Sequence, residues 1–348
     1  MSEPLRVAIA GYGLAGAVFH APLVAATDGL EIAAVTTSDP ERAARAREAY
    51  PGVEVAPDAD ALLGDAAAID VLVIATPNRM HIPIARAALG ARIAVVMDKP
   101  IAADATAAAA LVDDFEAANV PLTVFQNRRW DGDFLTVRRM VESGELGPIT
   151  RFESRFERFR PEIRAGAWRE LPAAREGGGL LLDLGAHLVD QALALFGAPL
   201  RVYAEIDERR PGAQVEDDVF VALEHTGGVR AHLWMSAIAP TGGRSLRASG
   251  THAGVQTPGL DPQEGQLAAG LRPGDYGWGE GEPARIVNGD GERSVPIARG
   301  AYEAFYAGVR DALRDGADMP VDPRESVAAL RVIESARRSA REATVIDT

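Results

Sequence analysis

The chain opens with LRVAIAGYGLAG at residues 5–16, the stretch that decides the fold of its first part. Residues 5–9 are apolar except for one arginine and predict a short buried strand. The glycines that follow have the spacing G-x-G-x-x-G and lead into a helical pattern, a context in which this motif predicts a dinucleotide site. The alternative is an ordinary glycine-rich turn. The dinucleotide interpretation predicts cofactor contacts from Gly11, Tyr12, Gly13, Leu14, Ala15 and Gly16.

Short apolar runs alternate with helical patterns over the first 125 residues. Strands are expected at 5–9, 31–37, 53–56, 70–75, 93–97 and 122–125, and helices at 15–26, 40–49, 81–89 and 103–118. Continuously apolar strands separated by helices indicate a parallel sheet covered on both faces. The sequence therefore predicts a doubly wound α/β domain over residues 1–125 that binds a dinucleotide.

The pattern changes after residue 126. A helix is expected at 131–143 and another within 178–196, and strands at 149–159, 201–208, 219–224, 230–237 and 245–249 have no helices between the last four. Residues 251–300 are rich in Gly, Pro and Asp and are expected to form long loops, followed by helices at 302–314 and 324–341. This predicts a second α/β domain over 126–348 with an open, mostly antiparallel sheet, whose last helices can pack back on the first domain.

Composition excludes several classes of function. The 348 residues contain no cysteine, so disulfides, iron–sulfur clusters and cysteine nucleophiles are excluded. The formal net charge of −14 makes nucleic acid and anionic membrane poor partners. No apolar run is long enough to span a membrane and no basic leader is visible, so we expect a cytoplasmic protein. No cluster of metal ligands is evident, and no metal is expected.

The end of the second strand is the place that distinguishes NAD from NADP. A carboxylate there would bind the ribose 2′-hydroxyl, but the sequence places Thr37 and Ser38 at the strand end and Arg42 in the next helix. Small hydroxyls and an arginine suit a 2′-phosphate and favour NADP. The alternative is that Asp39 takes the acidic role and the cofactor is NAD.

One lysine stands among 36 basic residues, and it is Lys99. It lies in Asp98-Lys99-Pro100, at the end of the fifth strand, where the carboxyl ends of parallel strands face the ligand. A flexible ammonium there can polarise a substrate oxygen or assist proton transfer. The strand expected at 70–75 is followed by Thr76, Pro77, Asn78 and His81, which we expect to contact the cofactor. Asp98 and Lys99 are expected to contact the cofactor as well. His81 can instead cap the helix that follows, and no catalytic role is expected for it.

Asp183 and His187 are four residues apart in the predicted helix after Gly177-Gly178-Gly179, and so lie on one face. An imidazole has a pKa near 6.5 and is a natural proton acceptor for an alcohol. The alternative is a core histidine whose hydrogen bonding Asp183 satisfies.

These motifs, in this order and spacing, resemble the Gfo/Idh/MocA family: G-x-G-x-x-G at 11–16, T-P-N-x-x-H at 76–81, D-K-P at 98–100, and G-G-G-x-x-x-D-x-G-x-H-x-x-D at 177–190. The family usually has Glu before the lysine, so Asp98 departs from it, which leaves the role of Lys99 intact and can shift its orientation. The segments 18–23, 126–136, 158–162 and 259–264 look like the branch that contains NADP-dependent scyllo-inositol 2-dehydrogenases. The resemblance covers the whole chain.

The resemblance implies a Rossmann domain, a second domain with an open sheet, and Lys99, Asp183 and His187 as the catalytic set. It also implies a homodimer or homotetramer that associates through the second-domain sheet, and hydride transfer between nicotinamide and a cyclic polyol or sugar. The residues expected to line a polyol pocket are Arg128, Arg129, Trp130, Arg160 and Trp168, unless they brace the two domains instead. Two other functions stay open: a reductase of another carbonyl or imine, and a non-catalytic dinucleotide sensor.

Overall fold

The computed structural model describes residues 3–64, 68–163 and 178–348. The chain divides into two compact units that each use several segments. Unit 1 comprises Met1–Asn127, Gln263–Trp278 and Ala301–Ser326, and unit 2 comprises Arg128–Pro262, Gly279–Gly300 and Val327–Thr348.

Unit 1 is built on a six-stranded parallel sheet with the strand order β3-β2-β1-β4-β5-β6. The strands are β1 Leu5–Ala10, β2 Leu30–Thr36, β3 Glu54–Ala56, β4 Val71–Ile74, β5 Ala94–Met97 and β6 Leu122–Val124. Every residue of β4 and β5 is buried, as expected for strands covered on both faces. This order is that of a dinucleotide-binding Rossmann sheet, and it confirms the predicted parallel fold.

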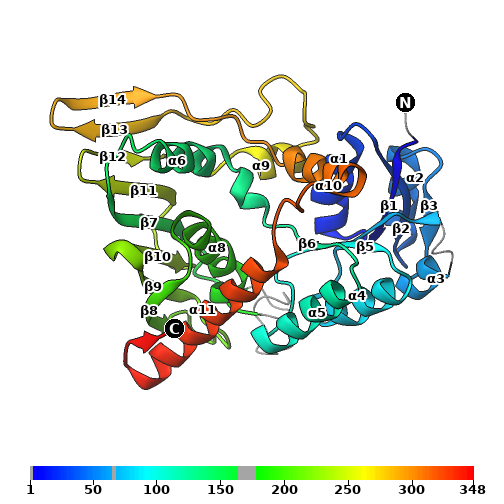
Figure 1. Cartoon of the computed structure of the whole chain (residues 1–348), viewed down its shortest axis with the longest axis horizontal. Coiled ribbons are helices and arrows are strands. Elements are labelled where there is room, and N and C mark those ends of the chain that lie inside the picture. The colour runs from blue at the N-terminus through cyan, green and yellow to red at the C-terminus, as the bar shows by residue number, and fades with distance from the viewer. Residues whose placement is uncertain (1–2, 65–67, 164–177) are drawn as a thin grey trace. The chain divides into compact units, whose positions relative to one another are not determined.

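Helices cover this sheet on both sides. The helical elements of unit 1 are η1 Ala15–His20, α1 Ala21–Ala25, α2 Pro40–Ala49, α3 Ala59–Leu63, η3 Asn78–Met80, α4 His81–Gly90, α5 Ala105–Ala117, α9 Gln263–Ala268 and α10 Glu303–Asp315. In Figure 1, α4 and α5 lie along one side of the sheet, and α1 and α10 along the other. Aspartate caps fix the starts of several of them: Asp39 accepts hydrogen bonds from the first turn of α2, and Asp104 does so for α5.

Unit 2 is built on a nine-stranded sheet with the order β14-β13-β12-β11-β7-β10-β9-β8-β15. Its strands are β7 Ile149–Glu157, β8 Pro199–Asp207, β9 Asp218–His225, β10 Arg230–Ser236, β11 Arg244–Gly250, β12 Ala253–Gln256, β13 Ala284–Asn288, β14 Gly291–Val295 and β15 Ile346–Asp347. Only the pairing of β10 with β7 is parallel among the described ladders of this sheet, so the prediction of a mostly antiparallel sheet is confirmed.

The helical elements of unit 2 are η4 Asn127–Trp130, α6 Gly132–Glu142, α7 Leu180–Asp183, α8 Gly185–Phe196, η6 Thr226–Gly228 and α11 Pro323–Glu342, which begins in unit 1. Helix α6 packs against β11, and α8 packs against β7 and β10. One face of the central strands is buried, with Phe152, Val221 and Leu233 in the core, and the other face is half-exposed.

The prediction of long loops over residues 251–300 is wrong. That stretch forms β12, α9, β13 and β14. Strand β14 has almost entirely exposed side chains, and β13 buries only Ala284 and Ile286, so the alternation of apolar and polar residues in this stretch is too short to mark two strands. Backbone pairing across the turn at Gly289 and Asp290, as in Asn288 opposite Gly291, forms the hairpin.

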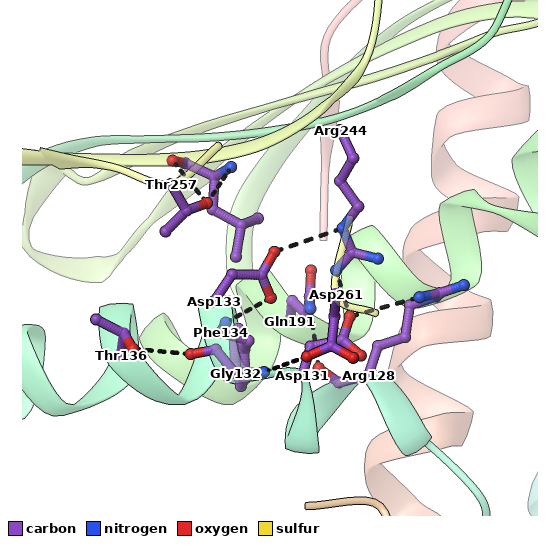
Figure 2. A network of polar contacts seen from close by, with 11 residues as sticks. Arg128, Asp131, Gly132, Asp133, Phe134, Thr136, Gln191, Arg244, Thr257 and Asp261 are labelled. Carbon is purple, nitrogen blue, oxygen red and sulfur yellow. Dashed lines mark hydrogen bonds and ion pairs between the residues drawn. The ribbon is translucent and has the colours of Figure 1, made fainter. Parts of the chain in front are cut away.

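A network of buried charges holds the start of α6 (Figure 2). The Asp131 carboxylate lies 2.5 Å from the Arg244 guanidinium of β11 and 3.4 Å from that of Arg128. The backbone N–H of Gly132 donates to Asp261, at 2.7 Å. A side chain on Gly132 would lie 2.2 Å from the carbonyl oxygen of Ala298, so the backbone approaches that carbonyl too closely for any other residue. The first turn of α6 is therefore fixed by three separate segments of unit 2.

Asp133 is the unusual member of this network. Its Oδ1 accepts a hydrogen bond from the backbone N–H of Phe134, and its Oδ2 lies 3.7 Å from the Nε of Arg244. Burial raises the pKa of the Asp133 carboxyl to about 6, against the charge of Arg244 and with a contribution from the neighbouring charge of Asp131. Because the folded protein then binds a proton that the unfolded chain has lost, Asp133 stabilises the fold below about pH 4, and this stabilisation disappears as the pH rises through about 6.

We therefore expect Asp133→Asn to be less destabilising, or more stabilising, at pH 8 than at pH 5. The amide keeps the acceptor for Phe134 and never ionises, so the difference in free energy of unfolding between variant and wild type should shift by about 1.4 kcal/mol between these conditions. Urea denaturation at both pH values measures it. The control is Asp131→Asn, which should lower the free energy of unfolding at both pH values, because Arg244 loses its charged partner. An unchanged difference for Asp133→Asn would show that this carboxyl is ionised throughout.

Candidate active site

The glycine-rich turn in unit 1 has the shape of a phosphate cradle. Gly11 has φ +100°, and a side chain there would lie 2.5 Å from the carbonyl oxygen of Ala75. A side chain on Gly16 would lie 2.0 Å from the carbonyl oxygen of Gly11. Gly13 is different, because the nearest atom to its missing Cβ is the Arg42 guanidinium, at 3.8 Å. The first and third glycines thus serve close packing, and the second leaves space into which a pyrophosphate fits.

The end of β2 holds this turn in place. The hydroxyl of Thr36 accepts a hydrogen bond from the backbone N–H of Gly11 at 2.8 Å, and its carbonyl accepts one from Tyr12 at 2.9 Å. Thr36 was not among the predicted site residues, since it lies within the strand, where a threonine is ordinarily read as a strand former. Leu14, two residues after Tyr12, is largely exposed on this turn.

The polar residues after β2 are arranged around the start of α2. The Thr37 hydroxyl accepts from the backbone N–H of Asp39, and Ser38 lies exposed between them. The Asp39 carboxylate accepts from the backbone N–H groups of Glu41 and Arg42 and lies 3.4 Å from the Arg42 Nε. The hydrogen bond from Arg42 and the others with it hold the pKa of Asp39 below its usual value. This carboxylate is thus engaged as a helix cap, next to an arginine that reaches toward Gly13.

His81 joins the ends of two strands in unit 1. It is buried at the start of α4, with Nδ1 2.9 Å from the carbonyl oxygen of Pro100 and Nε2 2.9 Å from that of Thr76. Burial lowers the pKa of the imidazole, although Asp98 and the two carbonyl oxygens act in the opposite direction. His81 therefore positions the segment Thr76–Asn78 against the turn that carries Lys99.

Lys99 is half-buried at the carboxyl end of β5, and its peptide bond to Pro100 is cis. Its backbone N–H donates to the Asp98 carboxylate at 2.8 Å. Burial would raise the pKa of Asp98, but His20, Lys99 and His81 outweigh it and the pKa is lowered. Asp98 is therefore an ionised carboxylate directly beside the single lysine.

His20 of η1 belongs to this cluster. Its Nδ1 lies 2.6 Å from the Tyr306 hydroxyl of α10, its Nε2 lies 3.9 Å from the Asp98 carboxylate, and its ring packs on Phe125. The partner Tyr306 is 286 residues away in the sequence, so no local pattern could reveal the contact.

In unit 2, Asp183 ends α7 and His187 lies in the first turn of α8. The backbone stays helical through Leu184, so the two residues are one turn apart, as predicted from their spacing. Gly185 lies between them, and a side chain there would lie 2.9 Å from the Met235 sulfur of β10. This close packing fixes the start of α8 against the sheet. It thereby fixes the position of His187, which lies in the first turn of α8 and is buried.

The residues predicted to line a polyol pocket have different environments. Arg129 makes a two-bond ion pair with the buried Asp190, at 2.8 and 2.6 Å. Arg128 is buried in the network of Figure 2. Trp130 is half-buried, Arg160 is exposed, and Trp168 lies outside the described residues. Asp190 is a positioning residue; the sequence analysis includes it in the motif at 177–190 but gives it no role, because its partner is 61 residues distant.

Unit 1 thus brings together the glycine turn, Thr37, Arg42, Thr76–Asn78 and the Asp98–Lys99 pair, and unit 2 brings together Asp183 and His187. Within the described ranges, no three His, Asp or Glu residues are placed to hold a metal ion. Among the described helices, none is both long and apolar enough to cross a membrane.

Comparison with known proteins gives two family matches that together span most of the chain. Residues 5–126 match the oxidoreductase family with an NAD-binding Rossmann fold, and residues 134–256 match the GFO/IDH/MocA C-terminal domain. Over 99% of its length the chain is 33% identical to scyllo-inositol 2-dehydrogenase (NADP(+)) IolW of Bacillus subtilis, of which it covers 96%. It is 37% identical to the oxidoreductase YdgJ of Escherichia coli, with 98% of each chain covered. The solved structure of the oxidoreductase YvaA from Bacillus subtilis superposes with a TM-score of 0.93 and 32% identity, over 100% of this chain and 99% of that one.

Proposed function

This chain belongs to the GFO/IDH/MocA family of oxidoreductases, and from that premise we propose that it is an NADP-dependent dehydrogenase of a cyclic polyol or sugar, of the scyllo-inositol/inosose kind. The observation that carries the proposal is the single lysine, Lys99, at the carboxyl end of β5, beside an ionised carboxylate. Residues 1–125 bind the cofactor, and residues 126–348 bind the substrate and associate with other copies. We also propose a cytoplasmic location.

The residues present fit a dinucleotide. Gly13 leaves the backbone open where a pyrophosphate would approach, Thr37, Ser38 and Arg42 would hold the ribose end, and Thr76, Pro77 and Asn78 would hold the nicotinamide end. When bound, the nicotinamide supplies or accepts the hydride. NADP is favoured over NAD because Asp39 is engaged as a helix cap and paired with Arg42.

In this proposal three side chains handle the proton and the developing charge. His187 takes the hydroxyl proton when the alcohol is oxidised and returns one in reduction. Lys99 donates a hydrogen bond to the reacting oxygen and stabilises its negative charge. Asp183 orients the substrate and tunes the pair formed by Lys99 and His187. The proposal requires the side chains of Lys99 and His187 to reach the same substrate oxygen at about 3 Å.

The substrate class rests on the relatives and on side chains of unit 2. A ring with many hydroxyls is bound by donors for its oxygens and a flat apolar face for its C–H side, which Arg128, Arg129, Trp130, Arg160 and Trp168 would supply. The ion pair with Asp190 fixes the plane of the Arg129 guanidinium, so a bound hydroxyl meets donors that are already oriented. A reductase of another carbonyl or an imine would use the same catalytic set.

Lys99→Arg keeps the charge and changes shape and proton chemistry. We expect at least a ~10²-fold loss of kcat, the scale of a missing acid–base or oxyanion contact, with NADPH binding largely retained. The assay follows NADPH at 340 nm with inososes, aldoses and an imine, and NADPH fluorescence reports binding. Arg86→Lys, an exposed conservative change on α4, is the control. Near-normal turnover by Lys99→Arg would contradict a catalytic role for the lysine. Turnover of the imine alone by the wild type would contradict the polyol as substrate and favour an imine reductase.

Arg42→Ala tests the cofactor preference. The KM for NADPH should rise by about tenfold, the scale of one lost charged hydrogen bond, while the KM for NADH changes little. Steady-state kinetics with both cofactors measure it. A wild type that prefers NADH, or an equal effect on both, contradicts the assignment.

The half-exposed face of the nine-stranded sheet supports a homo-oligomer. The rings of Phe220, His232 and Trp234 lie 5.2 to 5.8 Å apart on this face, and the Arg155 guanidinium stacks 3.7 Å from the Trp234 ring. An aromatic cluster of this kind on an open sheet is typical of a surface that a second copy covers.

We expect the wild type to sediment as a dimer or tetramer at micromolar concentration, and Trp234→Glu to sediment as a monomer, since a carboxylate would be buried against a second apolar face. Analytical ultracentrifugation measures both. Tyr276→Ser, which removes an exposed aromatic ring from unit 1, is the control and should not change the assembly. A monomeric wild type would refute the proposal.

A further inference from the structure

A row of three side chains in unit 1, Tyr306, His20 and Asp98, ends beside Lys99. The Tyr306 hydroxyl of α10 lies 2.6 Å from Nδ1 of His20, and Nε2 of His20 lies 3.9 Å from Oδ2 of Asp98. The other carboxylate oxygen, Oδ1, accepts a hydrogen bond from the backbone N–H of Lys99 at 2.8 Å. The row therefore connects a helix from the last part of the sequence to the single lysine of the chain.

The carboxylate sets the direction of the hydrogen bonds along this row. Asp98 has a lowered pKa and is ionised, so it only accepts, and the imidazole nitrogen that faces it, Nε2, carries a hydrogen. In a neutral imidazole Nδ1 is then an acceptor, and the Tyr306 hydroxyl donates to it. Burial raises the pKa of Tyr306 well above its usual value, and the charge of Asp98 acts in the same direction, so the hydroxyl keeps its hydrogen. Tyr306 thus stabilises the tautomer of His20 that presents an N–H to Asp98.

The imidazole is held in place from two sides. His20 is fully buried, its ring lies 4.5 Å from that of Phe125, and Phe305 packs edge-on against both Phe125 and Tyr306. Its backbone ends η1, the π-helical turn that begins at Ala15 within the glycine motif. Turns of this kind are rare and are often found at functional sites. The aromatic cluster and the π-helical turn together fix where His20 meets Asp98.

A carboxylate, an imidazole and a hydroxyl in this order also form the triad of hydrolases, but burial excludes a nucleophile here. The Tyr306 side chain is fully buried in unit 1, so its hydroxyl is closed to a substrate. The accessible end of the row is the half-buried Lys99. The row is therefore suited to hold that end in position.

We propose that His20 and Tyr306 are positioning residues for Lys99, which hold the Asp98 carboxylate and through it the backbone of the lysine. The inference rests on the proposed catalytic role of Lys99 and adds two residues that act only through Asp98. A displacement of about 1 Å at a reacting group can cost on the order of 10²-fold in rate, so the loss of one distant hydroxyl should be measurable in turnover.

The variants interrupt the row at its two contacts. Tyr306→Phe removes the hydroxyl and keeps the ring. His20→Asn can place a polar atom only near the position of Nδ1, whereas His20→Gln can place an N–H near that of Nε2, facing Asp98. Tyr276→Phe is the control, because it makes the same change as Tyr306→Phe at a fully exposed position of unit 1. Since the row is tested from both ends, a variant that fails to fold leaves the other end to decide.

Two measurements on the full-length protein separate positioning from stability. Steady-state kinetics with NADPH give kcat and KM. Labelling with ¹³C-lysine gives one side-chain signal in NMR spectra, because Lys99 is the only lysine, and this signal reports its surroundings without any substrate. Thermal unfolding checks the fold of each variant.

We expect Tyr306→Phe to lower kcat about tenfold, to change the KM for NADPH by less than about twofold, and to shift the Lys99 signal. His20→Asn should lower kcat at least as much, and His20→Gln should recover part of that loss. Adding Tyr306→Phe to His20→Asn should change nothing further, because the row is already interrupted. Tyr276→Phe should match the wild type.

If either kcat or the Lys99 signal of Tyr306→Phe is that of the wild type, the inference is overturned and the proposed function stands. A lower unfolding temperature with both unchanged would show that the row serves only stability. If the wild type turns over none of the inososes, aldoses or imine, the proposed function fails, and the Lys99 signal alone decides whether His20 and Tyr306 position the lysine.

Discussion

The close approach of the Gly11 backbone to the Ala75 carbonyl sets the geometry of unit 1. A single methyl group on Gly11 would lie 2.5 Å from that oxygen, so the end of β1 and the end of β4 meet with no side chain between them. Strand β4 pairs in parallel with β1 and with β5, so the ends of all three strands have fixed positions relative to one another. The glycine turn and the turn that carries Lys99 are thereby fixed to the same sheet edge, which is the edge where ligands bind in sheets of this order.

Electrostatics at that edge depend on Asp98. Its carboxylate accepts the backbone N–H of Lys99 and lies among His20, Lys99 and His81, whose combined effect overcomes the cost of burial. The same residues connect distant elements, because His20 reaches Tyr306 of α10 and His81 reaches Thr76 after β4. A shorter carboxylate than the glutamate usual at this position keeps the charge close to the backbone, where it holds the turn around Lys99.

The parts of the structure that sequence predicts well are those with local causes. Helix α2 was expected at 40–49 and is found there, because an aspartate cap and a proline at the first helical position mark its start. Strands β4 and β5 are apolar and buried along their whole length, so their position and parallel pairing follow from the pattern. The hairpin of β13 and β14 was missed because β14 is exposed along almost its whole length and the alternation in β13 is limited to Ala284 and Ile286. Asp190 ends the motif at 177–190, but its role was missed because that role depends on Arg129, and only the folded chain brings the two together.

Two sets of arginines differ in whether their ion pairs are buried. In unit 2, Arg129, Arg210 and Arg244 are buried, and each lies against a buried carboxylate at 2.5 to 2.8 Å. Breaking such a pair leaves a buried charge without a partner, so these arginines are fixed by stability. Beside the glycine turn, Arg42 lies 3.4 Å from the Asp39 carboxylate, and both side chains are largely exposed, so breaking that pair leaves no buried charge. In a chain that uses arginine for nearly every positive charge, residue type cannot tell these groups apart. The burial of the ion pair does, and the one lysine, Lys99, lies beside Asp98 in the unit that carries the glycine turn.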